Sequence, residues 1–311
     1  MLNLKVTKSD ANQRADVFLA GNLPQYSRSS LSGLFDKQMV SVNKLPIKAS
    51  RKLRAGEKLA IDTALLYARP KTINIPVIYE DKDVIVMNKP AGVLTHSKGA
   101  LNTEATLASF IEPKVADKNL KGNRAGIVHR LDRGTSGVIT AAKNEKTLKW
   151  LQKQFSTRKV KKTYLAIVEG VPEPRAAIID APIERNPNKP QTFRVSSSGR
   201  PAQTEYKLIK ILDKSSIFNE TSLSDKLALL ELQPLSGRTH QLRVHLKYIG
   251  HPIVGDRVYG RAGDPTKISK KFQAGKHLLL HAKSLELTLP GGRRKVFEAP
   301  EPGYFLELAQ S

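Results

Sequence analysis

Short apolar segments that follow one another without a helix between them constrain the fold of this chain more than any other feature. From residue 77 onward, the segments 83–87, 126–128, 138–142, 163–168, 228–232 and 278–280 have the composition of strands. Helical patterns are fewer, such as 145–155, where Leu148, Leu151 and Phe155 mark one face and Asn144 can cap the start. A wholly parallel sheet with helical crossovers does not fit this order. We predict an α+β fold, with a mixed, mainly antiparallel sheet and flanking helices over residues 77–311.

Residues 1–62 form a separate pattern at the start of the chain. Helical spacing occurs at 14–21 and 29–37, with Ser27 or Ser29 as the N-cap of the second helix, and strands are indicated at 39–43 and 58–62. The segment 63–76 contains two prolines and no helical period, which favours an extended connector. We therefore predict a small α/β domain at 1–62, a linker at 63–76 and a larger domain at 77–311.

The charge of the chain indicates a polyanionic partner. Its 311 residues include 52 Lys and Arg against 28 Asp and Glu, a formal net charge of +24, and such a surplus provides counterion-release affinity for nucleic acid. The basic residues are clustered, as at 158–162, 267–276 and 293–295. In the first domain, six of eleven basic residues lie in the last third, at Lys44, Lys48, Arg51, Lys52, Arg54 and Lys58. We expect Lys44, Lys48, Arg51, Lys52 and Arg54 of this cluster to contact nucleic acid.

Several kinds of partner are not indicated by the sequence. The absence of cysteine excludes disulfides, thiolate zinc sites and iron–sulfur clusters. His240 and His245 are five residues apart, not the four that align two ligands on a helix, so we expect no metal. No glycine-rich phosphate loop follows a strand, so we expect no cofactor. No apolar run reaches the roughly 20 residues that span a bilayer, and the start lacks a signal-peptide pattern, so we expect a cytoplasmic protein with no membrane partner.

One loop combines residues that carry chemistry. An apolar segment leads into His129, Arg130 and Asp132, and Gly134 and Gly137 allow tight turns before the next strand. A carboxylate between Arg130 and Arg133 is expected to stay ionised at neutral pH. Asp132 is therefore a candidate catalytic residue, although a lone Asp more often only braces a loop.

An ordered set of motifs accompanies this loop. His129-Arg130-Leu131-Asp132 and Thr135-Ser136-Gly137 resemble the signature of RluA-type pseudouridine synthases, and the other motifs follow in the order of that family. They are Asn88-Lys89-Pro90-Ala91-Gly92, the strand 162–170 with Tyr164, the segment 237–246 with Arg238 and Arg243, and 250–256 with Tyr259-Gly260. Gly134 and Ser236 are mild departures. Residues 1–62 resemble the RNA-binding module named after ribosomal protein S-four, except that Gln38 and Lys44 stand where that module has glycines.

The resemblance implies a pseudouridine synthase that isomerises uridine in structured RNA. It implies Asp132 as the nucleophile, Tyr164 stacked on the base, and Arg243 paired with Asp132. Helical spacing of Leu242, Leu246 and Ile249 would leave Arg243 on an adjacent face, able to reach that carboxylate. By resemblance, Arg130 fills the space of the flipped base and Leu242 lines its pocket. The remaining candidate substrate or RNA contacts are His129, Asn88, Lys89 and Arg238.

Alternatives remain open at this point. Tyr164 and Leu242 could be ordinary core residues, and the scaffold could belong to a non-catalytic RNA-binding protein for ribosome assembly. A glycosidase that uses the same Asp would release free uracil. Large-subunit ribosomal RNA is the favoured substrate because of the extra RNA-binding domain, with transfer RNA as the other, and a monomer is the default state.

Overall fold

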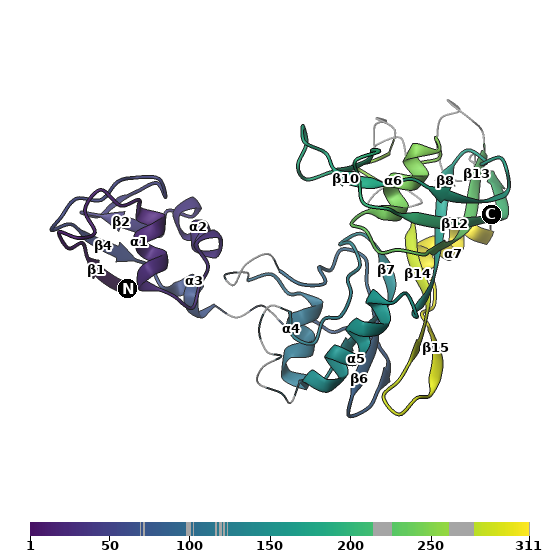
Figure 1. The fold of residues 1–311 in the computed structure, drawn as a ribbon, viewed down its shortest axis with the longest axis horizontal. Coiled ribbons are helices and arrows are strands. Elements are labelled where there is room, and N and C mark those ends of the chain that lie inside the picture. The colour runs from purple at the N-terminus through teal and green to yellow at the C-terminus, as the bar shows by residue number, and fades with distance from the viewer. Residues whose placement is uncertain are drawn as a thin grey trace. The chain divides into compact units, whose positions relative to one another are not determined.

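The computed structural model describes residues 1–68, 70, 72–97, 101, 103–115, 117, 120, 122, 124–213, 226–260 and 277–310 (Figure 1). The basic cluster at 267–276 lies outside the described residues. The chain forms two compact units. The first comprises Met1–Asn74, His96–Pro113 and Lys121–Ala125, and the second comprises Ile75–Thr95, Lys114–Leu120 and Gly126–Ser311. The break after Asn74 falls inside the segment 63–76, whereas His96–Pro113 groups with the first unit, where Leu101 packs against the core.

The first unit contains the two helices and the small sheet that were predicted for residues 1–62. Its elements are β1 (Leu2–Lys5), α1 (Ala15–Asn22), α2 (Arg28–Asp36), β2 (Val40–Val42), β3 (Leu45–Pro46) and β4 (Lys58–Ile61), and the strands pair in the antiparallel order β1-β4-β2-β3. Leu19, Leu31 and Leu34 are fully buried between the helices and the sheet. The Ser27 side chain accepts a hydrogen bond from Ser30 N and caps α2, which decides between the two predicted caps. The unit also contains α4 (Leu107–Ile111), and the 3₁₀ turn η1 (Glu112–Lys114) that follows ends on Lys114, which belongs to the second unit.

Two turns of this unit have the left-handed backbone that glycine usually provides. Gln38 has φ 58° and Lys44 has φ 66°. A side chain in this region costs about 1 kcal/mol relative to glycine, and the buried core offsets that cost.

The extended connector predicted at 63–76 is wrong in part. Residues Ala64–Tyr67 form one helical turn, α3, which begins where Ala64 N donates to the Asp62 carboxylate at 2.9 Å. Leu65 and Leu66 pack against the core of the first unit, and this tertiary contact explains a turn that has no helical period in the sequence.

The second unit is built on one large sheet. Its order is β5-β6-β7-β14-β8-β13-β12-β9, with β15 paired to β14, and β10 and β11 form a separate ribbon. The described pairings are antiparallel except the short one between β7 and β14. The α+β class with a mixed, mainly antiparallel sheet is therefore confirmed. The strands are β5 (Val77–Glu80), β6 (Val84–Lys89), β7 (Ser136–Ala142), β8 (Lys161–Glu169), β9 (Ala176–Asp180), β10 (Ile183–Arg185), β11 (Phe193–Val195), β12 (Gln203–Asp213), β13 (Lys226–Pro234), β14 (Leu280–Thr288) and β15 (Arg294–Glu298).

Three helices flank this sheet. They are α5 (Glu145–Ser156), α6 (Gln241–Tyr248) and α7 (Gly303–Gln310). Asn144 caps α5 by accepting a hydrogen bond from Thr147 N at 2.9 Å, as predicted. The predicted strand at 126–128 is wrong, because Ile127 forms only an isolated bridge with Ala141. Gly126 has φ 61°, and a Cβ there would lie 2.0 Å from the Ala142 carbonyl oxygen, so the chain turns at this glycine and only touches the sheet.

Candidate active site

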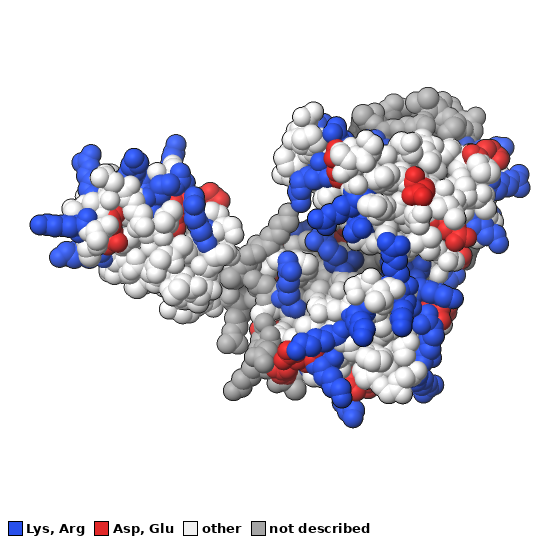
Figure 2. Space-filling view, in the orientation of Figure 1, with Lys and Arg blue, Asp and Glu red and all other residues white. Residues whose placement is uncertain are grey.

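A cavity of about 960 Å³ opens in the second unit, at the loop between residues 128 and 135. The beginning of β8, the segment after β13 and the beginning of α6 form the rest of its wall. Figure 2 shows Lys and Arg side chains gathered around a hollow of this unit. Asp132, Tyr164 and Arg243, which are far apart in the sequence, all line the same cavity.

The loop that carries Asp132 is held on both sides by buried hydrogen bonds. Thr95 Oγ1 donates to the Leu131 carbonyl at 2.8 Å and accepts from Leu131 N at 3.2 Å. Thr135 N donates to the Asp132 carbonyl at 3.1 Å. Because the backbone is fixed on either side of Asp132, its carboxylate is presented to the cavity from a rigid support.

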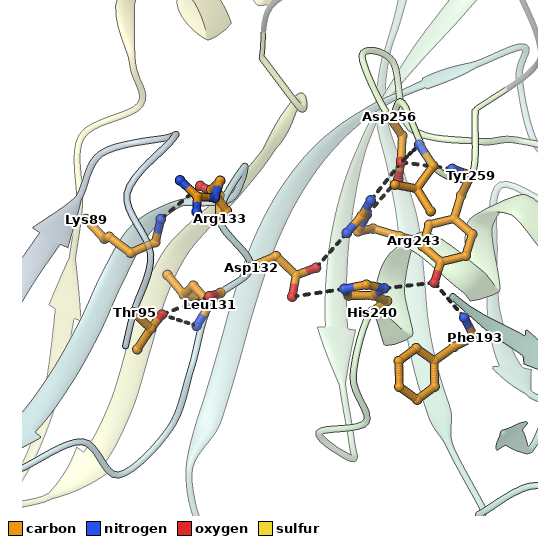
Figure 3. Close-up of polar contacts among 11 residues, drawn as sticks. Lys89, Thr95, Leu131, Asp132, Arg133, Phe193, His240, Arg243, Asp256 and Tyr259 are labelled. Carbon is orange, nitrogen blue, oxygen red and sulfur yellow. Dashed lines mark hydrogen bonds and ion pairs between the residues drawn. The ribbon is translucent and has the colours of Figure 1, made fainter. Parts of the chain in front are cut away.

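Lys89 also supports this loop and does not lie at the surface. Its ammonium group donates to the carbonyls of Pro90 and Val93, both at 2.9 Å. It also donates to the carbonyl of Arg133 at 3.3 Å (Figure 3). Burial lowers the pKa of Lys89 to about 7, against the opposing effect of Asp132. The prediction that Lys89 contacts RNA does not fit a side chain with no exposed surface, and its place is that of a buried brace.

Arg243 joins two carboxylates, of which only one was predicted. Its Nη1 donates to Asp132 Oδ2 at 3.0 Å, while Nε and Nη2 donate to Oδ2 and Oδ1 of Asp256 at 2.7 and 2.8 Å (Figure 3). The Tyr259 ring lies against the guanidinium, 4.9 Å from Cζ to the ring centroid. The predicted meeting of Arg243 and Asp132 is thus present, and the planar guanidinium is oriented by a second, bidentate partner.

Asp256 is the more deeply buried member of this group. Its side chain has no exposed surface, and Oδ1 also accepts from the backbone N–H groups of Val258 and Tyr259 at 2.9 and 3.0 Å. Burial alone would raise the pKa of Asp256, but the hydrogen bonds from Arg243 and these N–H groups outweigh it and lower that pKa. Likewise, burial opposes the charge of Arg243, and the two carboxylates more than compensate and raise its pKa.

His240 faces the other oxygen of the Asp132 carboxylate. Its Nε2 lies 3.9 Å from Asp132 Oδ1, and its Nδ1 lies 2.8 Å from the oxygen of the Tyr259 hydroxyl (Figure 3). That oxygen accepts a hydrogen bond from Phe193 N at 2.8 Å. Burial lowers the pKa of His240 below its ordinary value, against the opposing effect of Asp132. Among the described residues, no donor lies within hydrogen-bond distance of Asp132 Oδ1.

Tyr164 and Leu242 give the cavity part of its lining. Tyr164 lies on β8, its hydroxyl has no hydrogen-bond partner in the described part of the chain, and burial raises its pKa. Leu242 is buried in the core of the second unit and also lines the cavity, so the two interpretations of this residue are compatible. Both positions leave an apolar or aromatic surface next to Asp132.

The polar candidates around the cavity have different positions. Arg130 is exposed and lines it, and Arg238 lines it while Nε donates to the Pro201 carbonyl at 3.1 Å. His129 is stacked on Phe155, and its Nε2 accepts from Thr140 N at 3.0 Å, which ties the ring to the scaffold. Asn88 lies at the end of β6 and is not part of the cavity wall. Arg130 and Arg238 are thus placed to meet a ligand directly.

In the first unit, the basic cluster is largely free for an external partner. Lys44, Lys48, Lys52 and Arg54 are exposed. Arg51 differs, because its guanidinium donates to both oxygens of Glu57 at 3.0 and 2.7 Å. This ion pair stabilises the turn before β4, and because the Arg51 side chain is still 34% exposed, its contact with RNA stays a prediction.

The sequence did not identify three residues of the site. Asp256 and Tyr259 stood within motifs without an assigned role, and His240 was considered only as a metal ligand. Their order in the motifs was the only available signal, because the contacts depend on how the loop after α6 folds back onto that helix. Among the described residues, no group of three or more His, Asp or Glu side chains is arranged to hold a metal ion, and no helix there is long and apolar enough to cross a membrane.

The cavity and the supported carboxylate at the edge of a mixed sheet define a candidate active site, and comparison with known proteins gives its class, an RNA-modifying isomerase, and its family. A family model described as RNA pseudouridylate synthase matches residues 83–248. The chain belongs to this family, as its RluA-type motifs predicted, and is an RNA pseudouridine synthase. The expectation of a non-catalytic scaffold gains no support.

Individual relatives agree with this assignment. The chain is 37% identical over 300 residues to an uncharacterized RNA pseudouridine synthase of Aquifex aeolicus, with 94% of this chain and 92% of the relative covered. It is 36% identical over 306 residues to the ribosomal large subunit pseudouridine synthase D of Borreliella burgdorferi, with 94% and 87% covered. Human RNA pseudouridylate synthase domain containing 1 shares the fold at a TM-score of 0.57 and 25% identity, over 75% of this chain and 86% of that one.

Proposed function

We propose that this protein isomerises uridines of large-subunit ribosomal RNA to pseudouridine, with Asp132 as the nucleophile. The observation that carries the proposal is the asymmetry of the Asp132 carboxylate. Arg243 binds Oδ2 at 3.0 Å, whereas Oδ1 has no donor within hydrogen-bond distance among the described residues. The guanidinium orients the group and one oxygen keeps its lone pairs available, as covalent catalysis requires.

The reaction balances without an added reactant. The bond between uracil N1 and ribose C1′ breaks, the base turns while it stays in the cavity, and C5 forms the new bond to C1′. The hydrogen on C5 leaves as a proton and N1 gains one, so the product has the composition of the substrate. Tyr164 and Leu242 provide the walls against which a planar base could turn.

A uridine in folded RNA must leave its stack to reach Asp132, at a cost of a few kcal/mol. Arg130 is exposed at the cavity, and its planar guanidinium can stack in the vacated position and form hydrogen bonds there. We assign it this role and assign Arg238 a contact with the nucleotide, since it also lines the cavity. The exposed cations of the first unit, which we propose to be an S-four-like module, would hold the flanking RNA by its phosphates.

Ribosomal RNA is the favoured substrate because several relatives are named for the large ribosomal subunit. The test uses large-subunit ribosomal RNA and transfer RNA, each transcribed with uridine tritiated at C5. Release of tritium from the ribosomal transcript, with RNA mass unchanged, supports the proposal. Free uracil with an abasic site would instead indicate a glycosidase, and release from transfer RNA alone would refute the ribosomal substrate. Asp132→Asn should bind the transcript and release no tritium.

A further inference from the structure

His240 faces the reactive carboxylate at a backbone position that does not suit it. It is the N-cap of α6 with φ 57° and ψ 19°, in the left-handed region, and its side chain makes no capping hydrogen bond. Glycine adopts this conformation without strain and Asn tolerates it, whereas an imidazole gains nothing from it locally. Strain of this kind persists where the surrounding structure requires it, often at active sites. We therefore infer that the contacts of the His240 imidazole explain its left-handed backbone.

Hydrogen bonding around Tyr259 fixes the tautomer of His240. The Tyr259 side chain is buried, and its oxygen already accepts from Phe193 N. If His240 Nδ1 carried a proton, the phenol would accept twice and its own buried proton would have no acceptor, which is costly. With Nδ1 as the acceptor of the Tyr259 proton, every group is satisfied. The proton of the neutral ring then lies on Nε2, the nitrogen that faces Asp132.

The charge of this ring matters for Asp132. Burial opposes a positive charge on His240, as do Arg243 and Arg130, whereas Asp132 and Asp256 favour it. A protonated ring would move onto Oδ1 across the present 3.9 Å gap and form a second ion pair with Asp132. Both oxygens would then be occupied by cations, and no lone pair would be left for the nucleotide. The neutral ring leaves Oδ1 available, and the partial positive charge of its Nε2–H group faces that oxygen from 3.9 Å without a hydrogen bond.

We propose that His240 is a positioning residue for this isomerase: held by Tyr259 as the neutral tautomer with its proton on Nε2, it orients Asp132 Oδ1 toward the nucleotide without neutralising it. The inference rests on the proposed role of Asp132 and adds a residue that acts through it. Phe193 N, which donates to the Tyr259 hydroxyl, belongs to the β10–β11 ribbon. The ribbon therefore positions Tyr259, and Tyr259 in turn positions the His240 imidazole.

The first test is His240→Gly, because glycine suits the backbone and lacks the imidazole. The variant relieves the backbone strain but leaves the buried Tyr259 hydroxyl without its acceptor, so rates are compared at a temperature at which thermal unfolding shows wild type and variant to be fully folded. The single-turnover rate of tritium release from the ribosomal transcript should fall at least tenfold, with little change in RNA affinity. A rate within twofold of the wild type would overturn the proposal.

The second test is Tyr259→Phe, which keeps the ring against Arg243 and removes only the hydroxyl. Without that donor to Nδ1, the neutral ring loses support, so its pKa should rise and the acid limb of the single-turnover rate should move up by on the order of one pH unit. The control is Tyr206→Phe, which removes a hydroxyl bonded to the Pro174 carbonyl, away from the cavity wall. Profiles of Tyr259→Phe and wild type that superimpose would overturn the inference, as would a shift that persists in the double variant with His240→Gly. A wild type that forms no pseudouridine would instead refute the proposed function, which is a distinguishable result.

Discussion

Replacing Arg243 by methionine should destabilise the second unit far more than replacing Asp132 by asparagine. Arg243 makes three charge-assisted hydrogen bonds, two of them to Asp256, whose side chain has no exposed surface. Removing the cation leaves the Asp256 charge buried with only two backbone N–H donors, a loss of about 3–5 kcal/mol. Asp132 has one such bond and is 17% exposed, so Asp132→Asn should cost about 1 kcal/mol or less.

Urea unfolding followed by circular dichroism measures this difference. Equal denaturant slopes in the two variants would show that both expose the same amount of surface on unfolding. The double variant Arg243→Met/Asp256→Asn should regain part of the stability, because the charge left behind is then neutral. Arg243→Lys should lie between wild type and Arg243→Met, since an ammonium cannot bind two carboxylates in the fork geometry. An Arg243→Met variant within 1 kcal/mol of the wild type would contradict the role of Arg243 as the partner of a buried charge, and so would a double variant less stable than the single one.

Three further predictions concern the other contacts. The free energy of unfolding should rise between about pH 7 and pH 10, because in this range the unfolded chain holds a proton on Lys89 that the folded chain has released. Urea unfolding at a series of pH values tests this expectation. The rise should be absent in Lys89→Met. Replacing the exposed cations Lys44, Lys48, Lys52 and Arg54 by glutamine should weaken binding of the ribosomal transcript. The slope of log affinity against log salt concentration should become less steep by roughly one unit for each phosphate that is no longer neutralised. An unchanged slope in filter binding would contradict RNA anchoring by the first unit. Arg130→Lys should lower single-turnover rates on folded RNA more than on a short single-stranded oligonucleotide, and equal decreases on both substrates would argue against a role in base flipping.

Part of this site could be predicted from the sequence, because its signals are local. Helical spacing and an Asn cap located α5 close to its observed bounds. The same spacing in 239–249 oriented Leu242 and Leu246 toward the core and left Arg243 free to reach Asp132. The resemblance of the motifs identified Asp132 as the partner of Arg243, and the structure shows the two side chains in contact at 3.0 Å.

The rest depends on tertiary contacts that no local pattern encodes. A lysine is a surface residue by default, and the burial of Lys89 follows from three carbonyls that meet only when the loops at 90–93 and 133 come together. Asp256 reaches Arg243 because Gly250 and the following loop return the chain to α6, and its register could not be read from spacing. The left-handed backbone of His240 likewise has no signal in residue type, since it is imposed by the surroundings.

The most direct test of Asp132 as the nucleophile is single-turnover tritium release by Asp132→Asn. The assay uses enzyme in excess over the C5-tritiated ribosomal transcript, at concentrations where filter binding shows the RNA to be fully bound by wild type and variant alike. We expect no release above the rate without enzyme, with the fold intact. Release within tenfold of the wild-type rate would mean that another group carries out the reaction.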